Sequence, residues 1–363
     1  MRRRRPAVAC ASALLTLAAC ASPRSAPSLS PAASPPSAVA LLPLDDATGA
    51  DAPVARLGAR LAAALRARGI DVVAGERVER LAQSHGIRWT DGLDRETANT
   101  VRDELGVRGA LVGTVSLYGV EVPRLVLTLR LVDLGDKSIR WIDGVAITGD
   151  DAPGLLGAGR VGAIEPLEDR ALRELAASLA RRLDGDGARA HACDGRRYAP
   201  LTAFRSPRLG SIRGRTIAVL PFRADRTWRE AGRIVALEFV RQLAAVEGVT
   251  VVEPGIVQTA LRRFTDAGFS LDDASLAFDT IHADLILSGE VTQFEDGAGG
   301  SPRVSFKAHV LDRSSDKVVW DSISFGAGDQ GVWLFGMGRV HTASEVTCRL
   351  AASVVGGIAQ GAR

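Results

Sequence analysis

The side chains that most often carry out catalysis are scattered along this chain rather than grouped. The chain has five histidines with no paired metal-ligand spacing: His85, His191, His282, His309 and His341. Asp45 and Asp46 could form a carboxylate pair, but the matching positions in the second half of the chain are Arg223 and Ala224. No serine stands in a nucleophile-elbow pattern. We therefore expect no catalytic residue, no metal site and no cofactor apart from a covalent lipid.

A glycine-rich loop ending in arginine occurs twice, each time shortly before a predicted helix. The first loop contains Gly157, Gly159 and Arg160, and the second contains Gly336, Gly338 and Arg339. Glycines allow backbone N–H groups to converge on an anion, which an adjacent arginine could hold. The loops lack the Gly-Lys-Ser/Thr of a P-loop. The alternative is a tight turn whose arginine binds carbonyl groups or a carboxylate.

Two aromatic residues, Trp333 and Phe335, precede the second of these loops. Large apolar groups beside a turn either fill a core or form a partner-binding patch. The first loop is preceded only by Leu155 and Leu156. If there is a partner anchor, we expect it in the second half of the chain.

The N-terminus has the pattern of a bacterial export signal. Arginines at 2–5 precede a short apolar stretch, Ala7–Ala19, which is too short to span a bilayer comfortably. The stretch ends in Leu17-Ala18-Ala19-Cys20, which resembles the lipobox of bacterial lipoproteins. This predicts a signal peptide at 1–19, fatty acylation (palmitate-type chains) of Cys20, and a Pro/Ser/Ala tether over 20–37. The alternatives are an ordinary signal peptide with a chance cysteine, or a membrane anchor.

The residue after the lipobox cysteine is Ala21 rather than an aspartate, which resembles lipoproteins sorted to the outer membrane. No later stretch of 18 apolar residues occurs, so we expect membrane attachment through lipid alone, on the periplasmic face. The remaining cysteines, Cys193 and Cys348, are a disulfide candidate in an oxidising periplasm. Two buried free thiols are the alternative.

The net charge changes when the signal is removed. Residues 1–19 hold four arginines and no acid, so 45 basic residues become 41 against 42 acidic ones. A balance of −1 gives no electrostatic footprint for nucleic acid, and that class of partner is excluded.

A pattern of about 150 residues is written twice and predicts two domains. Val39–Leu44 matches Ile217–Phe222, and Asp133 precedes Trp141 by the same spacing as Asp312 precedes Trp320. We place the first module at 38–184, a linker rich in glycine, arginine and proline at 185–214, and the second module at 215–361. Each module has the usual size of one domain.

Within each module the periodicity predicts one order of elements. A short buried strand is followed by an amphipathic helix, a second strand and two shorter helices. Three strands then follow in hairpin succession, with alternation of the kind seen over 125–132 and 304–310. A closing helix carries leucines at 172, 175, 179 and 183 on one stripe. The predicted fold class is α+β, with two tandem α/β sandwich modules in which helices cover one face of a mixed sheet.

Three segments of the second module carry a family resemblance: the strand at 217–222, the stretch Ala283–Gly289, and Asp316–Trp320. They resemble the fold of the CsgG-like curli secretion lipoproteins, the N-terminal domain of TolB, and LpoB (an anticodon-binding-domain-like fold). The resemblance implies the fold rather than an activity. A curli-type channel implies extra apolar hairpins, for which 142–159 and 322–338 leave no room.

These observations together predict a non-enzymatic, periplasm-facing outer-membrane lipoprotein. It would bind an envelope protein, as a scaffold or regulator of peptidoglycan synthesis or surface-polymer export. A sensor of small anions through the Gly-Arg loops is the alternative, and a curli-type secretion component comes third. The two modules could also pair with each other.

Overall fold

The computed structural model describes residues 38–87, 92–151, 160–185, 193–262, 278, 280–297, 300–332 and 338–360. All of these belong to one compact unit, Pro36–Arg363. It contains two mixed β-sheets with the same strand order, so the predicted α+β class with two tandem sheets and packed helices is confirmed. The exact division at 184 and 215 stays a prediction.

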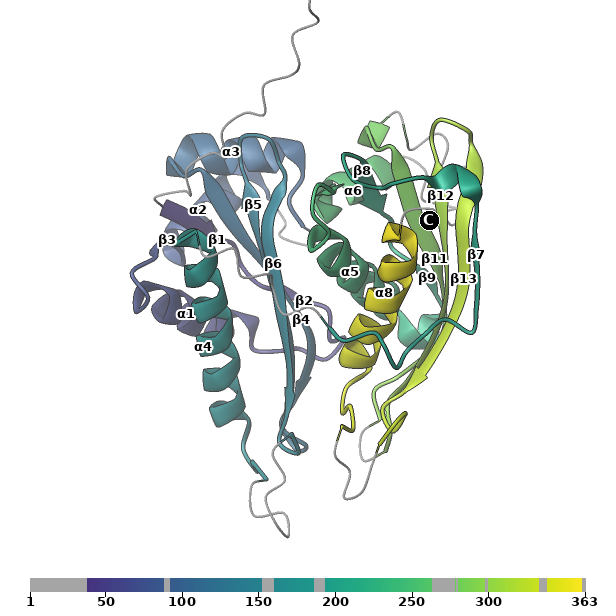
Figure 1. Cartoon of the computed structure of the whole chain (residues 1–363). Helices are drawn as coiled ribbons and strands as arrows, with labels where there is room; N and C mark the ends of the chain where they lie inside the picture. The colour runs from purple at the N-terminus through teal and green to yellow at the C-terminus, as the bar shows by residue number, and fades with distance from the viewer. Residues whose placement is uncertain are drawn as a thin grey trace, which may run out of the picture. The chain divides into compact units, whose positions relative to one another are not determined.

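The first sheet has the order β3-β1-β4-β5-β6, with β2 beside β4 (Figure 1). Its strands are β1 (Ala38–Leu41), β2 (Asp45–Asp46), β3 (Asp71–Val73), β4 (Gly109–Gly119), β5 (Arg124–Asp133) and β6 (Ile139–Thr148). β1 runs parallel to β3 and β4, whereas β4, β5 and β6 form an antiparallel meander. The three predicted hairpin strands are confirmed.

The second sheet repeats this order as β10-β8-β11-β12-β13 and adds an edge strand, β7. Its strands are β7 (Thr202–Arg205), β8 (Thr216–Val219), β9 (Arg223–Ala224), β10 (Thr250–Val251), β11 (Leu285–Glu295), β12 (Arg303–Asp312) and β13 (Lys317–Ala327). β9 pairs with β11 as β2 pairs with β4.

Helices pack on both faces of each sheet, which corrects the expectation that they cover one face. In the first half these are α1 (Val54–Arg66), α2 (Glu76–His85), α3 (Arg95–Leu105) and α4 (Ile164–Leu183). Leu57 of α1 and Leu175 of α4 share a core with Val39, while Val101 of α3 shares a separate core with Ala40. Successive residues of β1 therefore enter opposite cores, as expected for a parallel strand that is buried on both sides.

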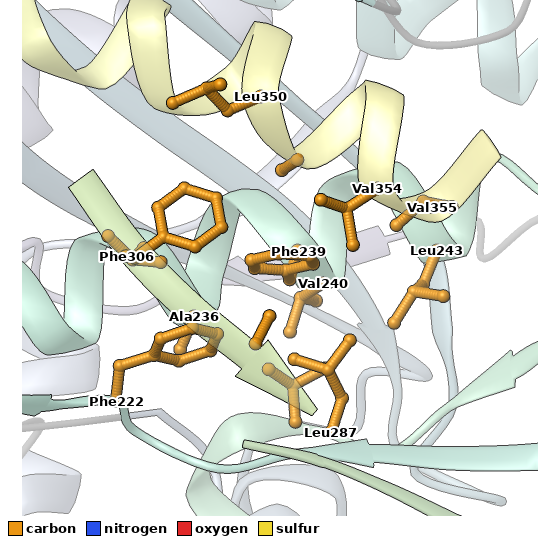
Figure 2. Packing of buried hydrophobic residues seen from close by; sticks show 14 of the residues in the cluster. Phe222, Ala236, Phe239, Val240, Leu243, Leu287, Phe306, Leu350, Val354 and Val355 are labelled. Atoms are coloured by element: carbon orange, nitrogen blue, oxygen red, sulfur yellow. The ribbon is translucent and has the colours of Figure 1, made fainter. Parts of the chain in front are cut away.

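The second half contains α5 (Ala231–Ala244), α6 (Pro254–Leu261) and α8 (Ala343–Ala359). α5 and α8 pack together on one face of the sheet, and three phenylalanines meet there (Figure 2). The rings of Phe222 and Phe239 stack at 5.3 Å between centroids, and Phe306 meets Phe239 edge-on at 5.5 Å. Such aromatic geometry adds to the free energy gained by burial.

The segment expected to be a linker does more than join the modules. Thr202–Arg205 pairs antiparallel with β13, and Tyr198, Leu209 and Ile212 are buried in the core of the second sheet. A disulfide between Cys193 and Cys348 attaches the start of this segment to α8. The packing of this segment could not be predicted from the sequence, because the apolar residues of the segment are isolated and follow no helical or strand period.

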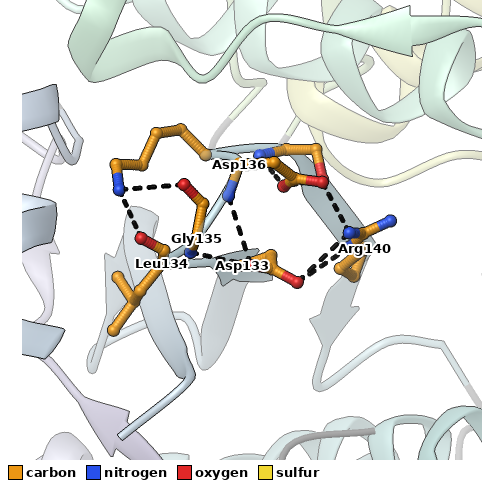
Figure 3. A network of polar contacts seen from close by, with 7 residues as sticks. Asp133, Leu134, Gly135, Asp136 and Arg140 are labelled. Atoms are coloured by element: carbon orange, nitrogen blue, oxygen red, sulfur yellow. Dashed lines mark hydrogen bonds and ion pairs between the residues drawn. The ribbon is translucent and has the colours of Figure 1, made fainter. Parts of the chain in front are cut away.

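The recurring aspartates, Asp133 and Asp312, stabilise turns. Oδ1 of Asp133 accepts a hydrogen bond from the backbone N–H of Gly135 at 2.8 Å (Figure 3). Arg140 forms ion pairs with Asp133 and Asp136. Oδ2 of Asp312 accepts hydrogen bonds from the backbone and hydroxyl of Ser315. An aspartate that binds backbone N–H groups just after a strand stabilises the reversal of the chain.

Candidate protein-binding surface

The two sheets carry equivalent faces that differ in what covers them. Gly144 of β6 lies opposite Thr128 of β5, and Ile323 of β13 lies opposite Lys307 of β12. Counted from the repeated Asp-to-Trp landmark, Gly144 corresponds to Ile323 and Ala146 corresponds to Phe325. Small residues on the first sheet are therefore replaced by large apolar residues on the second.

On the first sheet this face is covered by α5. Ile142 of β6 belongs to the same core as Val240 and Phe239 of α5. Nη2 of Arg241 donates to the carbonyl of Gly144 at 3.1 Å and lies 3.3 Å from Oδ1 of Asp143. A Cβ atom at Gly144 would lie only 3.1 Å from Nη1 of Arg241, so the absent side chain makes room for this contact.

Two ion pairs also join the first half of the chain to the second, and their side chains are largely buried. Arg130 of β5 holds Glu253 with two short bonds, Nη2–Oε1 at 2.7 Å and Nε–Oε2 at 2.9 Å. Their side chains are 3% and 0% exposed. Oε1 of Glu253 also accepts from the backbone N–H of Leu93. Arg233 of α5 pairs with Asp45. Buried, hydrogen-bonded pairs of this kind fix a geometry more than they add free energy.

Glu238 of α5 is buried near Arg241 and Asp143. Burial raises the pKa of its carboxyl group above the usual value, and the nearby Arg241 opposes this increase. Nη1 of Arg241 is 3.5 Å from Oε2 of Glu238, without the geometry of a hydrogen bond. A carboxyl in such a position favours its neutral form.

On the second sheet the matching face is exposed. On this face the exposed fraction is 56% for Phe204 of β7 and 37% for each of Ile323 and Phe325 of β13. Leu201, which precedes β7 and donates its backbone N–H to the carbonyl of Ile323, is 66% exposed. Phe204 pairs with Asp321, and Thr202 pairs with Ile323. Neighbouring exposed apolar residues on a rigid sheet are typical of protein-binding surfaces. We call this group of four residues the β7–β13 patch.

The predicted site residues are only partly within the described chain. Gly157, Gly159, Trp333, Phe335 and Gly336 lie outside the described residues, as does Cys20. Arg160 forms an ion pair with Asp150, and its hydrogen bond holds the pKa of that carboxyl below the usual value. Gly338 has a positive φ of 84°, and Arg339 is exposed. The anion-binding role of these loops stays a prediction.

Sequence reasoning missed Phe204, Ile323 and Phe325. The sequence predicted the last strand of the hairpin succession, but not which of its residues lie on an uncovered face. Comparing the two copies position by position would have shown the signal, because Gly144 and Ala146 become Ile323 and Phe325. Nothing in the sequence indicated that Phe204 would lie beside them.

In the described ranges, no group of histidine, cysteine, aspartate and glutamate side chains is arranged to hold a metal ion. None of the described helices combines the length and the apolarity needed to cross a bilayer.

No protein-family model matches the chain, and no curated relative matches it. Among solved structures, it is similar to the PelC dodecamer from Paraburkholderia phytofirmans, with 20% identity and a TM-score of 0.30 over 44% of this chain and 95% of that one. It is similar to lipoprotein GNA1162 from Neisseria meningitidis, with 17% identity and a TM-score of 0.30 over 40% and 99%. It is also similar to the LpoB C-terminal domain from Escherichia coli, with 13% identity and a TM-score of 0.23 over 32% and 85%.

Proposed function

We propose that this protein is a non-enzymatic lipoprotein of the outer membrane that binds another envelope protein through the β7–β13 patch. Cys20 supplies the lipid anchor, and the described modules face the periplasm. The partner belongs to machinery that assembles the envelope, such as peptidoglycan synthesis or surface-polymer export. The observation that carries the proposal is the exposure of Phe204, Ile323 and Phe325 within this patch, whereas the equivalent face of the first sheet is covered by α5.

The physical argument is that an apolar patch costs free energy while it remains in water. Each of these side chains would gain free energy when a partner covers it, because burying apolar surface yields about 25 cal/mol per Å². Large apolar anchors near the centre of an interface commonly carry most of the binding free energy. The Arg160–Asp150 pair gives no comparable support to an anion sensor, because the arginine already has a carboxylate partner.

A site-specific crosslink tests the proposal in cells. A photocrosslinking amino acid at position 325 should capture one defined envelope protein, and Ile323→Ser in the same chain should abolish that product. The matched control is position 122, since Val122 lies beyond the end of β4 and is comparably exposed, 43% against 37%. Equal products from both positions, or a product that survives Ile323→Ser, would contradict binding through this patch.

A further inference from the structure

The edge of the second sheet has the features of a site that accepts an additional strand. β7 is the last strand of the sheet, and within the described part of the chain no strand pairs with its outer edge. Thr202, Ala203 and Phe204 are exposed along it. The outermost strand of a sheet presents N–H and C=O groups that can pair with another chain. The strand contains neither proline nor lysine, two residues that commonly protect such edges.

The edge also lies in a basic stretch. Residues 193–215 contain six arginines and one acidic residue, Asp194. Carboxylates pair with three of these arginines, Arg196, Arg213 and Arg215. The other three, Arg197, Arg205 and Arg208, have no carboxylate partner among the described residues. Arg208 lies just after β7 in the 3-10 turn Pro207–Leu209 and is exposed.

The size of the surface decides between two kinds of occupant. The exposed parts of four apolar side chains amount to a few hundred Å², given that a whole aromatic side chain buries about 150–250 Å². A stable dimer buries about 800 Å² on each partner. A second copy paired through a strand of four residues falls short of this, whereas an extended peptide needs only a short edge and a few side-chain contacts.

We propose that β7 binds an extended, acidic peptide segment of a partner protein, which adds to the second sheet as a further strand. Its backbone pairs with the outer edge of β7. Its alternate apolar side chains contact Phe204 and the neighbouring Ile323, because alternate residues of a strand point to the same face. Its acidic residues are attracted by Arg208, which is exposed directly after β7. This inference rests on the proposed protein-binding function and specifies the partner segment.

Fluorescence anisotropy with the full chain in detergent tests the inference. The probes are labelled eight-residue peptides: alternating valine and glutamate, alternating valine and lysine, and the valine–glutamate peptide with proline at two central positions. We expect only the first to bind, with an affinity that falls as salt is added. Phe204→Ala should weaken this binding at least tenfold and Arg208→Ala about threefold, while Val122→Ala leaves it unchanged.

Three outcomes would overturn the inference: equal binding of the lysine or proline peptides, an affinity that is insensitive to Phe204→Ala, or a dimer in sedimentation that Phe204→Glu dissociates. Circular dichroism and a test for the Cys193–Cys348 disulfide would show whether each variant is folded. If a variant is misfolded, the comparison of the three peptides on the wild-type chain still tests the inference. A crosslink from position 325 without any peptide binding would reject this inference and leave the proposed function standing.

Discussion

At the scale of single residues, the most demanding feature is charge buried away from water. Glu253 has no exposed surface, and its carboxylate is satisfied by Arg130 from another sheet and by the backbone of Leu93. Removing a charge from water costs several kcal/mol, and only a well-formed partner offsets that cost. The pair therefore makes the contact between β5 and the start of α6 sensitive to either residue.

Arg130→Met should lower the free energy of unfolding by about 3–5 kcal/mol, because it leaves the buried Glu253 without its partner. Urea unfolding followed by circular dichroism measures the change. The double variant Arg130→Met, Glu253→Leu should recover most of the loss. Arg102→Met is the matched control, since Arg102 forms a solvent-exposed pair with Asp103 that adds little to stability. An equal effect of both single variants would show that burial is not the cause.

Glu238 predicts a pH dependence of stability. Its pKa in the folded protein is raised by burial above the usual value of 4.5, so folding favours the protonated form. This contribution is complete below pH 4.5 and is lost as the pH rises through the raised pKa. Arg241, Asp143 and Glu345 are the charged groups that act on it.

We expect Glu238→Gln to remove this dependence. The stability of the variant relative to wild type should increase from pH 4.5 to pH 8, by roughly 1.4 kcal/mol for each unit by which the pKa is raised. Urea midpoints at five pH values measure the difference. Burial also raises the pKa of Asp296, so Asp296 is kept in both proteins and its contribution cancels. A constant difference across this range would show that Glu238 keeps its ordinary pKa.

At the scale of elements, the helices and strands with strong periodicity could be predicted from the sequence, and those with weak signals could not. The leucines of α1 and α4 and the alternation in β5 and β12 identified these elements because each repeats over at least two turns or six residues. β7 has four residues and takes its place from tertiary contacts: pairing with β13, the buried Tyr198 and the disulfide to α8. No local pattern encodes such contacts. The packing of helices on both sheet faces was likewise hidden, because β1 shows a continuous apolar run that does not reveal its two environments.

The contact between α5 and β6 depends on a missing side chain. Gly144→Ile introduces the residue that the second sheet carries at the matching position, and it would collide with Arg241 and with Thr128, each 3.1 Å from the new Cβ. Overpacking of this kind costs about 1–3 kcal/mol. We expect the free energy of unfolding to fall by that amount, measured with urea. Gly162→Ile is the control, since no atom lies within 4 Å of a Cβ there. A similar loss in the control would attribute the effect to glycine itself.

At the scale of the whole molecule, the repeat is not symmetrical in its surfaces. The outward positions of α5 that cover the first sheet include Ile234, Leu237 and Arg241, and their counterparts in α1 are Arg56, Ala59 and Ala63. Arg56 instead pairs with Glu168 of α4 and faces solvent. A polar outer helix ends a series of stacked repeats. We therefore propose different roles for the copy with the covered sheet and the copy with the exposed sheet, the latter presenting the β7–β13 patch to a partner protein.

Attachment to the membrane is the remaining property of the whole chain, and we expect Cys20 to provide it. Several acyl chains on one cysteine hold a protein on a bilayer, whereas a single chain binds only marginally. Wild-type protein should remain in the membrane fraction after washing with salt and carbonate and should incorporate labelled palmitate. Cys20→Ala should lose the label and move to the soluble periplasmic fraction once its signal is cleaved. Cys10→Ala changes the other cysteine of the predicted signal and should leave both properties intact. A processed Cys20→Ala protein that stays on the membrane would show that another segment anchors the chain.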